Sequence, residues 1–318
     1  KIKDNKMKIF SWIIKDTSID FLGFRKIAYA ITAVLFAASI ASVAVRGFNY
    51  GIDFSGGVLI EVKSKNGPVD VDKVRSELDT LNLDELNLQS FGDAQDELMI
   101  RAQANNADEE SQRVAVQQIK KMLENDFTFE RIESVGPQVG DELKLSGILA
   151  SVFAMLAISL YIWFRFEWKF AVGALIGLFH DLLITVGLVS IFHLDFSLTT
   201  IAAILTLAGY SVNDTVVTYD RVRENLQKYK KMPQYDLLNK SINDIFSRTI
   251  LTGITTFLAS AALLVFGGDA LHSFAFVITT GIVIGTFSSI FICVPVINMF
   301  DLRATPDEKD VNPFGNVQ

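Results

Sequence analysis

Six long runs of apolar residues constrain this 318-residue chain more than any other feature of its sequence. A run of about 18 or more apolar residues with few charges is long enough to cross a bilayer as a helix. Half of all residues are hydrophobic and the mean hydropathy is +0.34. We therefore predict six transmembrane helices, at 27–45, about 147–164, 170–192, 197–219, 249–266 and 274–300.

The first apolar run follows a basic segment, as the apolar part of a secretory signal peptide does. It is not followed by a convincing cleavage site of small residues, and further apolar runs come after it. We therefore interpret it as an uncleaved first helix. The chain starts at Lys1 rather than Met, and we expect its N-terminus to have been trimmed.

The distribution of Lys and Arg predicts the orientation of the helices, because short loops rich in these residues stay in the cytoplasm. Seven of the first 26 residues are basic, and six Lys and Arg residues lie in 221–247. The alternate connections, 193–196 and 267–272, hold none. The turn 165–169 holds Arg165 and Lys169. We therefore expect four cytoplasmic segments: residues 1–26, the turn 165–169, the loop 221–247 within the helical region 146–300, and the tail 301–318.

One long hydrophilic segment, 47–145, follows the first helix (27–46) and is predicted to lie outside the cytoplasm. It carries 20 acidic and 10 basic residues, a net charge of −10, which leaves +3 for the rest of a chain whose total is −7. This acidic segment does not suit nucleic acid, which calls for a basic face. Because Cys293 is the only cysteine, the segment must fold by its apolar core without an internal disulfide.

The same segment alternates strand and helix patterns. Branched and apolar residues predict strands at 57–62, 88–91, 97–101 and 127–135, and helical spacing predicts helices at 69–81 and 108–126. This order is the split βαβ pattern of ferredoxin-like folds. The predicted fold class is therefore an α-helical polytopic membrane protein, with six transmembrane helices plus one external α+β ferredoxin-like domain.

Asp214 is the most informative polar residue inside a predicted span, and Asn213 next to it is predicted to be a supporting polar group. An acid in hydrocarbon is costly, and a neutral Asn would pack equally well, so Asp214 is a functional candidate. It lies roughly 10 Å from the cytoplasmic end of its helix at about 1.5 Å per residue. The fifth helix starts at that end, so Arg248 could approach Asp214, with Thr252 and Thr255 on the same helix face.

A carboxyl group in a low-dielectric site favours its neutral form, and a nearby Arg favours its charged form. If two conformations differ in this balance, Asp214 binds a proton in one and releases it in the other. No GxxxxGK[ST] loop and no HExxH motif occurs in the sequence. We therefore expect a proton-coupled machine rather than an ATP-driven one or an enzyme, with no cofactor and no metal ion.

His180 and Asp181, near the middle of the third predicted helix, leave two interpretations open. They either order helix packing as a buried pair or support the site at Asp214. An intramembrane hydrolase is a further alternative, but it needs a nucleophile within reach of His180, which the sequence does not establish. The rows of hydroxyls in the spans could likewise serve only close helix packing.

The stretch GIDFSGG joins the first helix to the predicted outer domain. Gly51, Gly56 and Gly57 allow tight turns or a close approach of the backbone, and Asp53 lies between them. We predict a hinge that transmits tilt between membrane and domain. A plain turn into the first strand is the alternative.

Six motifs occur in a characteristic order: RGFNYGIDFSGG (46–57), VGPQVGDEL (135–143), FHD (179–181), GYSVNDTVVTYDRVREN (209–225), SRTILTGITT (247–256) and FGG (266–268). Together they resemble the SecD/SecF family of protein-export membrane subunits, which belongs to the resistance–nodulation–division superfamily of proton-driven transporters. The motifs are spread along most of the chain in the order of the family, and none of them departs from the family pattern.

The resemblance implies a subunit of the bacterial cytoplasmic (inner) membrane, with 47–145 in the periplasm. It implies SecD as a pseudo-symmetric partner, association with the SecYEG channel and YajC, and protons as the energy source for late steps of Sec-dependent export. An unfolded polypeptide would contact the outer domain after SecA has started its transport. Asp214 and Arg248 match the family's proton-relay residues, and SecD would supply a further Asp.

A half-unit of a proton-coupled small-molecule or lipid exporter is the alternative function. Such a protein could use the same proton chemistry at Asp214. One small outer domain, rather than large porter domains, disfavours it.

Overall fold

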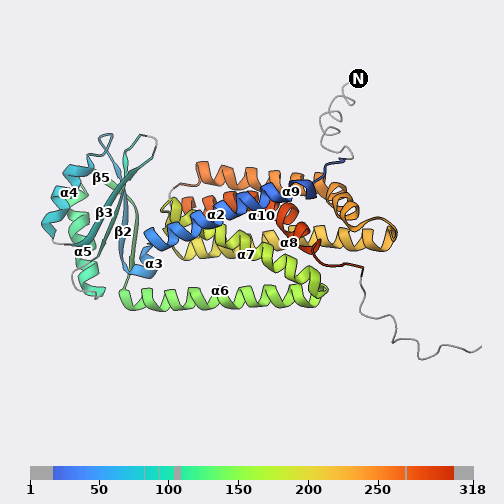
Figure 1. The fold of residues 1–318 in the computed structure, drawn as a ribbon. Coiled ribbons are helices and arrows are strands. Elements are labelled where there is room, and N and C mark those ends of the chain that lie inside the picture. Colours follow the sequence, from blue (N-terminus) through green and yellow to red (C-terminus); the bar gives the residue numbers. More distant parts are fainter. Residues whose placement is uncertain (1–16, 82, 93, 104–108, 269–270, 304–318) are drawn as a thin grey trace, which may run out of the picture.

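The computed structural model describes residues 17–81, 83–92, 94–103, 109–268 and 271–303. Long helices run side by side in a bundle, and a smaller domain of strands and helices stands at one end of it (Figure 1). The predicted cytoplasmic segments 1–26 and 301–318 fall largely outside the described residues, which begin at Thr17 and end at Arg303.

Within the described residues, six helices are long and apolar enough to cross a membrane, as predicted. A short turn at Leu22–Phe24 leads into the first of them, and the sixth is interrupted by the π-helical turn η4 (Ser289–Cys293) before its last turn α11 (Val294–Ile297). The six are α2 (Arg25–Arg46), α6 (Pro137–Arg165), α7 (Trp168–Ile191), α8 (Leu198–Lys228), α9 (Gln234–Phe266) and α10 (His272–Ser288).

The second of these helices begins earlier than hydropathy predicts. Its apolar run starts near 147, but α6 begins at Pro137, directly after Gly136. Proline suits the first helical position, because its missing N–H would have no partner there and its φ is already helical. The polar first turns of α6 therefore extend into the segment 137–145 and contact α3 (Ile52–Ser55) at the base of the domain (Figure 1).

The third and sixth spans form the centre of the bundle. In their most apolar stretches 56% and 61% of the residues are buried, against 11% in each of the first two spans. The outer surface of α6 is strongly apolar, as the exposed side chains of Phe153 and Phe164 illustrate. A helix that is apolar on its exposed face is typical of contact with lipid.

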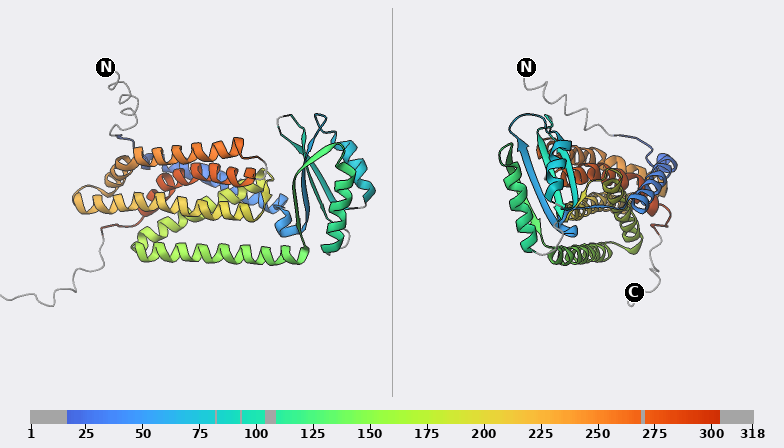
Figure 2. Two further views of the ribbon diagram at one scale, coloured as in Figure 1. Left: turned by 180° about the vertical axis from the view of Figure 1, so that it is seen from behind. Right: turned by 90° about the vertical axis from the view of Figure 1, so that its left-hand side faces the viewer.

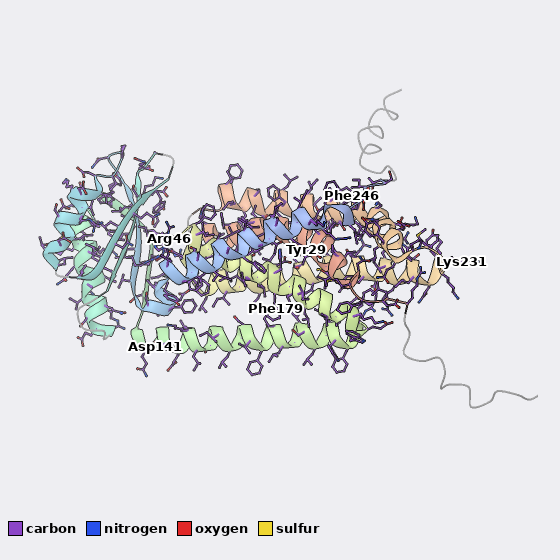
Figure 3. All side chains as sticks on the ribbon, in the orientation of Figure 1. Tyr29, Arg46, Asp141, Phe179, Lys231 and Phe246 are labelled. Carbon is purple, nitrogen blue, oxygen red and sulfur yellow. The ribbon has the colours of Figure 1, made fainter. Side chains whose placement is uncertain are left out.

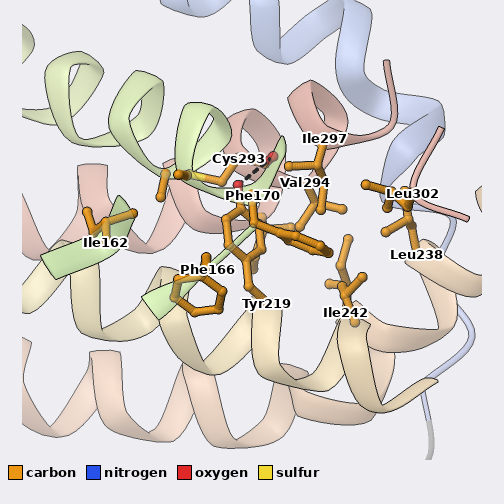
Figure 4. Close-up of a cluster of buried hydrophobic side chains, with 14 of the residues drawn as sticks. Ile162, Phe166, Phe170, Tyr219, Leu238, Ile242, Cys293, Val294, Ile297 and Leu302 are labelled. Atoms are coloured by element: carbon orange, nitrogen blue, oxygen red, sulfur yellow. Dashed lines mark hydrogen bonds between the residues drawn. The ribbon is translucent and has the colours of Figure 1, made fainter. Parts of the chain in front are cut away.

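A cluster of buried hydrophobic side chains, with Tyr219 among them, packs inside the bundle (Figure 4). The Tyr219 side chain is fully buried, and its hydroxyl donates a hydrogen bond to the backbone oxygen of Cys293 at 3.0 Å. The rings of Phe166 and Phe170 meet the Tyr219 ring edge-on, with centroids 5.9 and 5.2 Å away. Tyr219 thereby fixes α8 against the irregular turn η4.

The domain at the end of the bundle has the predicted βαββαβ order, which confirms the ferredoxin-like fold. Its four-stranded sheet has the order β3-β4-β2-β5, and neighbouring strands are antiparallel. One face of the sheet carries the two helices and the other faces the bundle (Figure 2). The elements are β2 (Gly57–Ser64), α4 (Val71–Leu78), β3 (Asp84–Phe91), β4 (Glu97–Gln103), α5 (Glu109–Leu123) and β5 (Phe127–Val135).

The central strand β2 is buried on both sides. Val58, Ile60 and Val62 point into the core beneath the two helices. Leu59 and Glu61 lie on the opposite face and line a cavity of about 320 Å³ between the domain and the bundle. The sheet therefore lies directly against the end of the helical bundle, and the domain is not held at a distance by linkers.

The crossing of α2 and α7 offers a test of the packing. A Cβ atom added at Gly187 would lie 2.1 Å from the Cβ of Ser39 and 2.7 Å from its Cα. Relieving this contact requires the backbone to move, and overpacking of this kind costs about 1–3 kcal/mol. We expect Gly187→Ala to lower the melting temperature of the purified protein in detergent.

Gly209→Ala is the matched control, because no described atom lies within 4 Å of a Cβ added there. It is expected to leave the melting temperature unchanged or to raise it slightly, since Ala favours helices. Equal melting temperatures for the two variants would show that α2 and α7 do not cross in this way.

Candidate functional site

The Asp214 carboxylate is held by hydroxyl groups. Asp214 lies in α8 and is half-buried. The Ser289 hydroxyl of η4 donates a hydrogen bond to one carboxylate oxygen at 2.5 Å, and the Thr249 hydroxyl of α9 donates to the other at 3.3 Å. Three elements of the bundle therefore meet at this side chain.

Arg248 lies beside this site without closing on it. It precedes Thr249 in α9, its side chain is exposed, and it acts electrostatically on Asp214. Among the described residues, no hydrogen bond and no ion pair within 4.0 Å joins the two side chains. Arg248 instead borders a surface cavity of about 540 Å³ whose charged lining also includes Asp220, Arg221, Glu224 and Asp244.

The other predicted partners on these two helices do not reach Asp214. Asn213 is exposed, as are Thr252 and Thr255. The Thr252 hydroxyl donates to the backbone oxygen of Arg248 at 2.9 Å, and the Thr255 hydroxyl donates to that of Leu251 at 3.0 Å. These side chains therefore form a polar strip on the outside of the bundle, and their supporting role stays a prediction.

His180 and Asp181 form a second polar site, which is almost completely buried: 3% and 1% of these residues is exposed. One oxygen of Asp181 lies 2.8 Å from His180 Nδ1. The other accepts hydrogen bonds from Ser211 of α8 and, at 2.8 Å, from Ser288 of α10. This site links the three most central helices, α7, α8 and α10.

The partners of both acids could not be identified from sequence alone. Two adjacent serines inside a long apolar run, Ser288 and Ser289, are an unusual pattern and the one signal that could point to them. Helical spacing predicts a face of Arg248, Thr252 and Thr255, which does not include Thr249. The geometry places Thr249, on the neighbouring face, closer to Asp214 than any of these.

An intramembrane hydrolase would need a nucleophile near His180, and one hydroxyl group lies within reach of it. The Thr32 Oγ1 of α2 lies 3.1 Å from His180 Nε2. An acyl-transfer site also needs backbone or side-chain donors free to bind an oxyanion. Thr32 lies inside the regular helix Arg25–Arg46, where neighbouring backbone N–H groups are engaged in the helix. This geometry therefore favours helix linkage or proton handling over nucleophilic catalysis.

The junction between domain and membrane is a second candidate site. Asp53 accepts a hydrogen bond from the backbone N–H of Leu198 at 2.9 Å and so caps the start of α8. Two short strands, β1 (Asn49–Tyr50) and β6 (Asp195–Phe196), pair in parallel, and Gly51 N–H donates to the backbone oxygen of Phe196 at 3.0 Å. The GIDFSGG stretch is thus attached directly to the helix that carries Asp214.

An ion pair extends this junction into the domain sheet. The Arg101 guanidinium of β4 contacts Asp195 at 2.7 Å, and a second nitrogen donates to the Asn49 side chain at 3.3 Å. The Asn49 amide donates in turn to Asp195 at 2.7 Å. Arg101, Asn49 and Asp195 therefore connect the domain, the end of α2 and the start of α8 in one network.

Gly56 and Gly57 make the turn into β2. Their φ angles are +71° and +112°, which side chains rarely adopt, so glycine is required there. A Cβ atom added at Gly140 of α6 would lie 3.3 Å from the backbone nitrogen of Gly56. The structure places Gly51, Asp53, Gly56 and Gly57 at the junction of three elements, and their action as a hinge stays a prediction.

The arrangement defines a polytopic membrane protein in which a small ferredoxin-like domain is attached by hydrogen bonds to α8, the helix that carries the half-buried Asp214. Comparisons with known proteins assign the family. Residues 115–303 match the C-terminal model of the protein export membrane proteins SecD/SecF, and residues 41–67 match the SecD/SecF GG motif. The chain belongs to the SecD/SecF family of protein export membrane proteins.

Individual relatives agree with this assignment. The protein translocase subunit SecF of Rickettsia rickettsii is 46% identical over 285 residues, which cover 88% of this chain and 91% of the relative. The corresponding subunit of Rickettsia prowazekii is 46% identical over 288 residues, with 89% and 91% covered.

Solved structures are similar as well. The crystal structure of SecDF from Thermus thermophilus, a translocon-associated membrane protein, matches with a TM-score of 0.79 and 34% identity over 89% of this chain. A super-membrane-facing form of SecDF matches with a TM-score of 0.64 and 35% identity. This chain spans 39% of the length of either SecDF chain.

Arg101→Gln tests the junction. Hydrogen bonds to charged groups contribute about 1.5–3 kcal/mol, and the Arg101 side chain is only 17% exposed. We expect the domain to become loosely oriented on the bundle when this contact is lost. Spin labels at Asn66 in the domain and Phe192 at the end of α7 should then give a broader distance distribution.

Lys73→Gln is the control, because Lys73 pairs with Glu77 at 3.9 Å within α4 and both side chains are exposed. Such surface pairs contribute about 0–1 kcal/mol. Unchanged distances in Arg101→Gln, or the same broadening in Lys73→Gln, would contradict an orienting role for Arg101.

Proposed function

We propose that this chain is a subunit of a SecD–SecF complex that uses the proton gradient to promote late steps of Sec-dependent protein export. The observation that carries this proposal is the environment of Asp214: a carboxyl group inside a membrane span, bound by hydroxyls, with an unpaired arginine beside it among the described residues. Family membership supplies the export context.

The hydroxyl partners suit a carboxyl group that changes its charge. A carboxylate only accepts hydrogen bonds, whereas a protonated acid also donates one. Ser289 and Thr249 can donate to the first form and accept from the second. Neither form of Asp214 would therefore lose its hydrogen bonds, which is the loss that makes buried polar groups costly.

Arg248 would decide between the two forms of Asp214. A guanidinium close to the carboxylate favours its charged form, and withdrawal of the guanidinium favours protonation. The two residues lie on neighbouring helices, α8 and α9, so a shift of one helix along the other changes their separation. Proton binding and release at Asp214 would accompany this movement in each transport cycle.

The polar outer strip supports a partner in the membrane. Arg248, Asn213, Thr252 and Thr255 are exposed on helices predicted to lie in the bilayer, where uncovered polar groups are unfavourable. The SecDF chain is more than twice as long as this one, as the 39% coverage shows. We propose that a SecD subunit covers the strip and that the complex works with SecYEG and YajC on an unfolded polypeptide.

The junction would transmit movement between proton site and domain. Asp53 and the β1–β6 pairing are attached to the first turn of α8, the helix that carries Asp214. A tilt of α8 would therefore displace the sheet of the domain, and the turn at Gly56 and Gly57 would act as the hinge. The domain would then change its contact with the emerging chain.

A half-unit of a small-molecule or lipid exporter could use the same proton chemistry. Its transported molecule would need large porter domains, but the segment 47–136 forms one four-stranded domain next to the bundle. We therefore favour export of polypeptides. The proposed location is the bacterial inner membrane, with both termini in the cytoplasm and the domain in the periplasm.

Asp214→Asn tests the proton site. The substitution keeps the shape of the side chain and removes its titration, so stimulation of export by the proton gradient should fall to the level seen without a gradient. The measurement is transport of a slowly secreted client into inverted vesicles, with and without a gradient. Asp236→Asn, an exposed acid at the start of α9, is the control.

Arg248→Met should abolish the stimulation in the same assay, because it removes the charge and keeps much of the length. Arg248→Lys should retain part of it, since Lys keeps the charge without the planar fork of Arg. Full stimulation in Asp214→Asn at normal protein levels would remove Asp214 from the mechanism. Full stimulation in Arg248→Met would do the same for Arg248.

The proposed orientation predicts which ends of the bundle are accessible from each side of the membrane. Arg46 and Asp141 lie at the domain end, and Lys231 lies at the opposite end (Figure 3). In spheroplasts, Asn66→Cys in the domain should react with a membrane-impermeant thiol reagent. Lys231→Cys should react only after the membrane is opened. The native Cys293 is buried and serves as the unlabelled background. The reverse pattern would invert the topology.

A further inference from the structure

The proposed function leaves a second buried acid without a role. Asp181 lies in the centre of the bundle, where 1% of the residue is exposed. It binds His180 and accepts hydrogen bonds from Ser211 and Ser288. An asparagine would link the same helices at a lower electrostatic cost. Helix packing alone therefore does not explain why this residue is an acid rather than an amide.

Two adjacent serines connect this acid to Asp214. Ser288, the last residue of α10, donates to Asp181 at 2.8 Å. Ser289, the first residue of the π-turn η4, donates to Asp214 at 2.5 Å. The two acids lie on different helices and also act on each other electrostatically. One turn of the sixth span thus holds both carboxyl groups, and π-turns are frequent at functional sites.

His180 continues the series of polar groups towards α2. Its Nδ1 lies 2.8 Å from Asp181, and its Nε2 lies 3.1 Å from the Thr32 hydroxyl. The Phe36 and Phe287 rings flank the imidazole, with centroids 5.4 and 6.3 Å away. The imidazole therefore has a polar partner at each nitrogen and apolar surroundings elsewhere.

These contacts suit a histidine that gains and loses a proton. With Nδ1–H donating to Asp181, neutral His180 accepts a hydrogen bond from Thr32 at Nε2, and protonated His180 donates one to Thr32. The imidazolium charge is balanced by the adjacent Asp181 carboxylate. Uptake of one proton changes the net charge of the pair from −1 to 0, so the proton neutralises a buried charge.

We propose that His180 and Asp181 form a second proton-binding site, coupled to Asp214 through Ser288 and Ser289. This proposal rests on the proposed function, in which Asp214 carries a proton. When Asp214 releases its proton to solvent, His180 Nε2 takes up one proton from solvent, so the number of protons bound by the two sites stays the same, and the reverse step restores the starting state. No other bond is formed or broken.

The surroundings contain few other groups that titrate. The titratable side chains that act on Asp181 from the elements packed against it are His180 on α7, Asp214 on α8 and Cys293 on η4. The helix α2 contributes the Thr32 hydroxyl and the Phe36 ring, and α10 contributes Ser288. Arg248 on α9 is the cation that acts on Asp214. The proposed coupling therefore runs between two acids and one histidine.

The experiment is ¹⁵N NMR of the histidine-labelled full chain in lipid nanodiscs. The chain has three histidines, so His193→Gln and His272→Gln assign the signals. We expect the His180 signal to change with pH. Its midpoint should move to lower pH in Asp214→Asn, because the substitution removes a negative charge that favours the protonated imidazole. A signal without pH dependence, or a midpoint unmoved by Asp214→Asn, overturns the proposal.

Matched variants separate coupling from packing. Ser289→Ala should move the His180 midpoint in the same direction as Asp214→Asn, because it removes a hydrogen-bond donor that stabilises the charged form of Asp214. Thr185→Val is the control: this buried hydroxyl lies one turn along α7 and has no hydrogen-bond partner among the described residues. A change in both variants would show that His180 reports packing, and a change in neither would show that Ser289 does not couple the two sites; either outcome overturns the proposed coupling.

The export assay distinguishes this inference from the proposed function. Asp181→Asn should reduce gradient-stimulated export several-fold at equal levels of assembled protein. If Asp214→Asn abolishes stimulation and Asp181→Asn leaves it intact, the second site fails and the proposed function stands. If Asp214→Asn itself exports normally, the proposed function fails, and the pH dependence of His180 decides the second site alone.

Discussion

The cost of an unsatisfied polar group in hydrocarbon governs the arrangement of this protein. Asp181 binds hydroxyls of α8 and α10 and the adjacent imidazole of His180, and Asp214 binds hydroxyls of α9 and η4, so α7, α8, α9 and the sixth span can meet in only a few ways. Asp181 links the three central helices, α7, α8 and α10, and Asp214 links α8 to α9 through the Thr249 hydroxyl. Apolar packing between helices is weakly directional in lipid, and these polar contacts supply the direction that it lacks.

The same requirement acts at the boundary between bundle and domain. The first backbone N–H groups of α8 have no partner within the helix, and Asp53 and Ser197 supply acceptors to two of them. Because Asp53 belongs to the entry of the domain, capping the helix also positions the sheet above it. Arg101 extends the contact to β4. A domain bound in this way follows the first turn of α8, which a flexible linker would not achieve.

The six spans and the βαββαβ order follow from periodicity and hydropathy, because both depend on residues close together in sequence. Hydropathy does not mark the start of α6, because the first turns of this helix, at 137–145, are polar. The partners of Asp214 depend on contacts between helices far apart in sequence. Helical spacing identified Arg248 with Thr252 and Thr255 as one face of α9, but the rotation of α9 turns that face outwards and brings Thr249 to the acid.

The rotation of α9 leaves Arg248 at the surface of the bundle, and this position affects how the proposed proton site is controlled. Hydroxyl partners accommodate both forms of a carboxyl group, so Ser289 and Thr249 hold Asp214 in place without selecting its charge. In the proposed mechanism Arg248 would select the charge of Asp214; it lies at the surface of the bundle and forms no ion pair with Asp214 in the described residues. A cation at a surface can be moved by whatever covers it, whereas one in the core cannot. Because Arg248 is exposed, a partner in the membrane could move its side chain towards Asp214 or away from it.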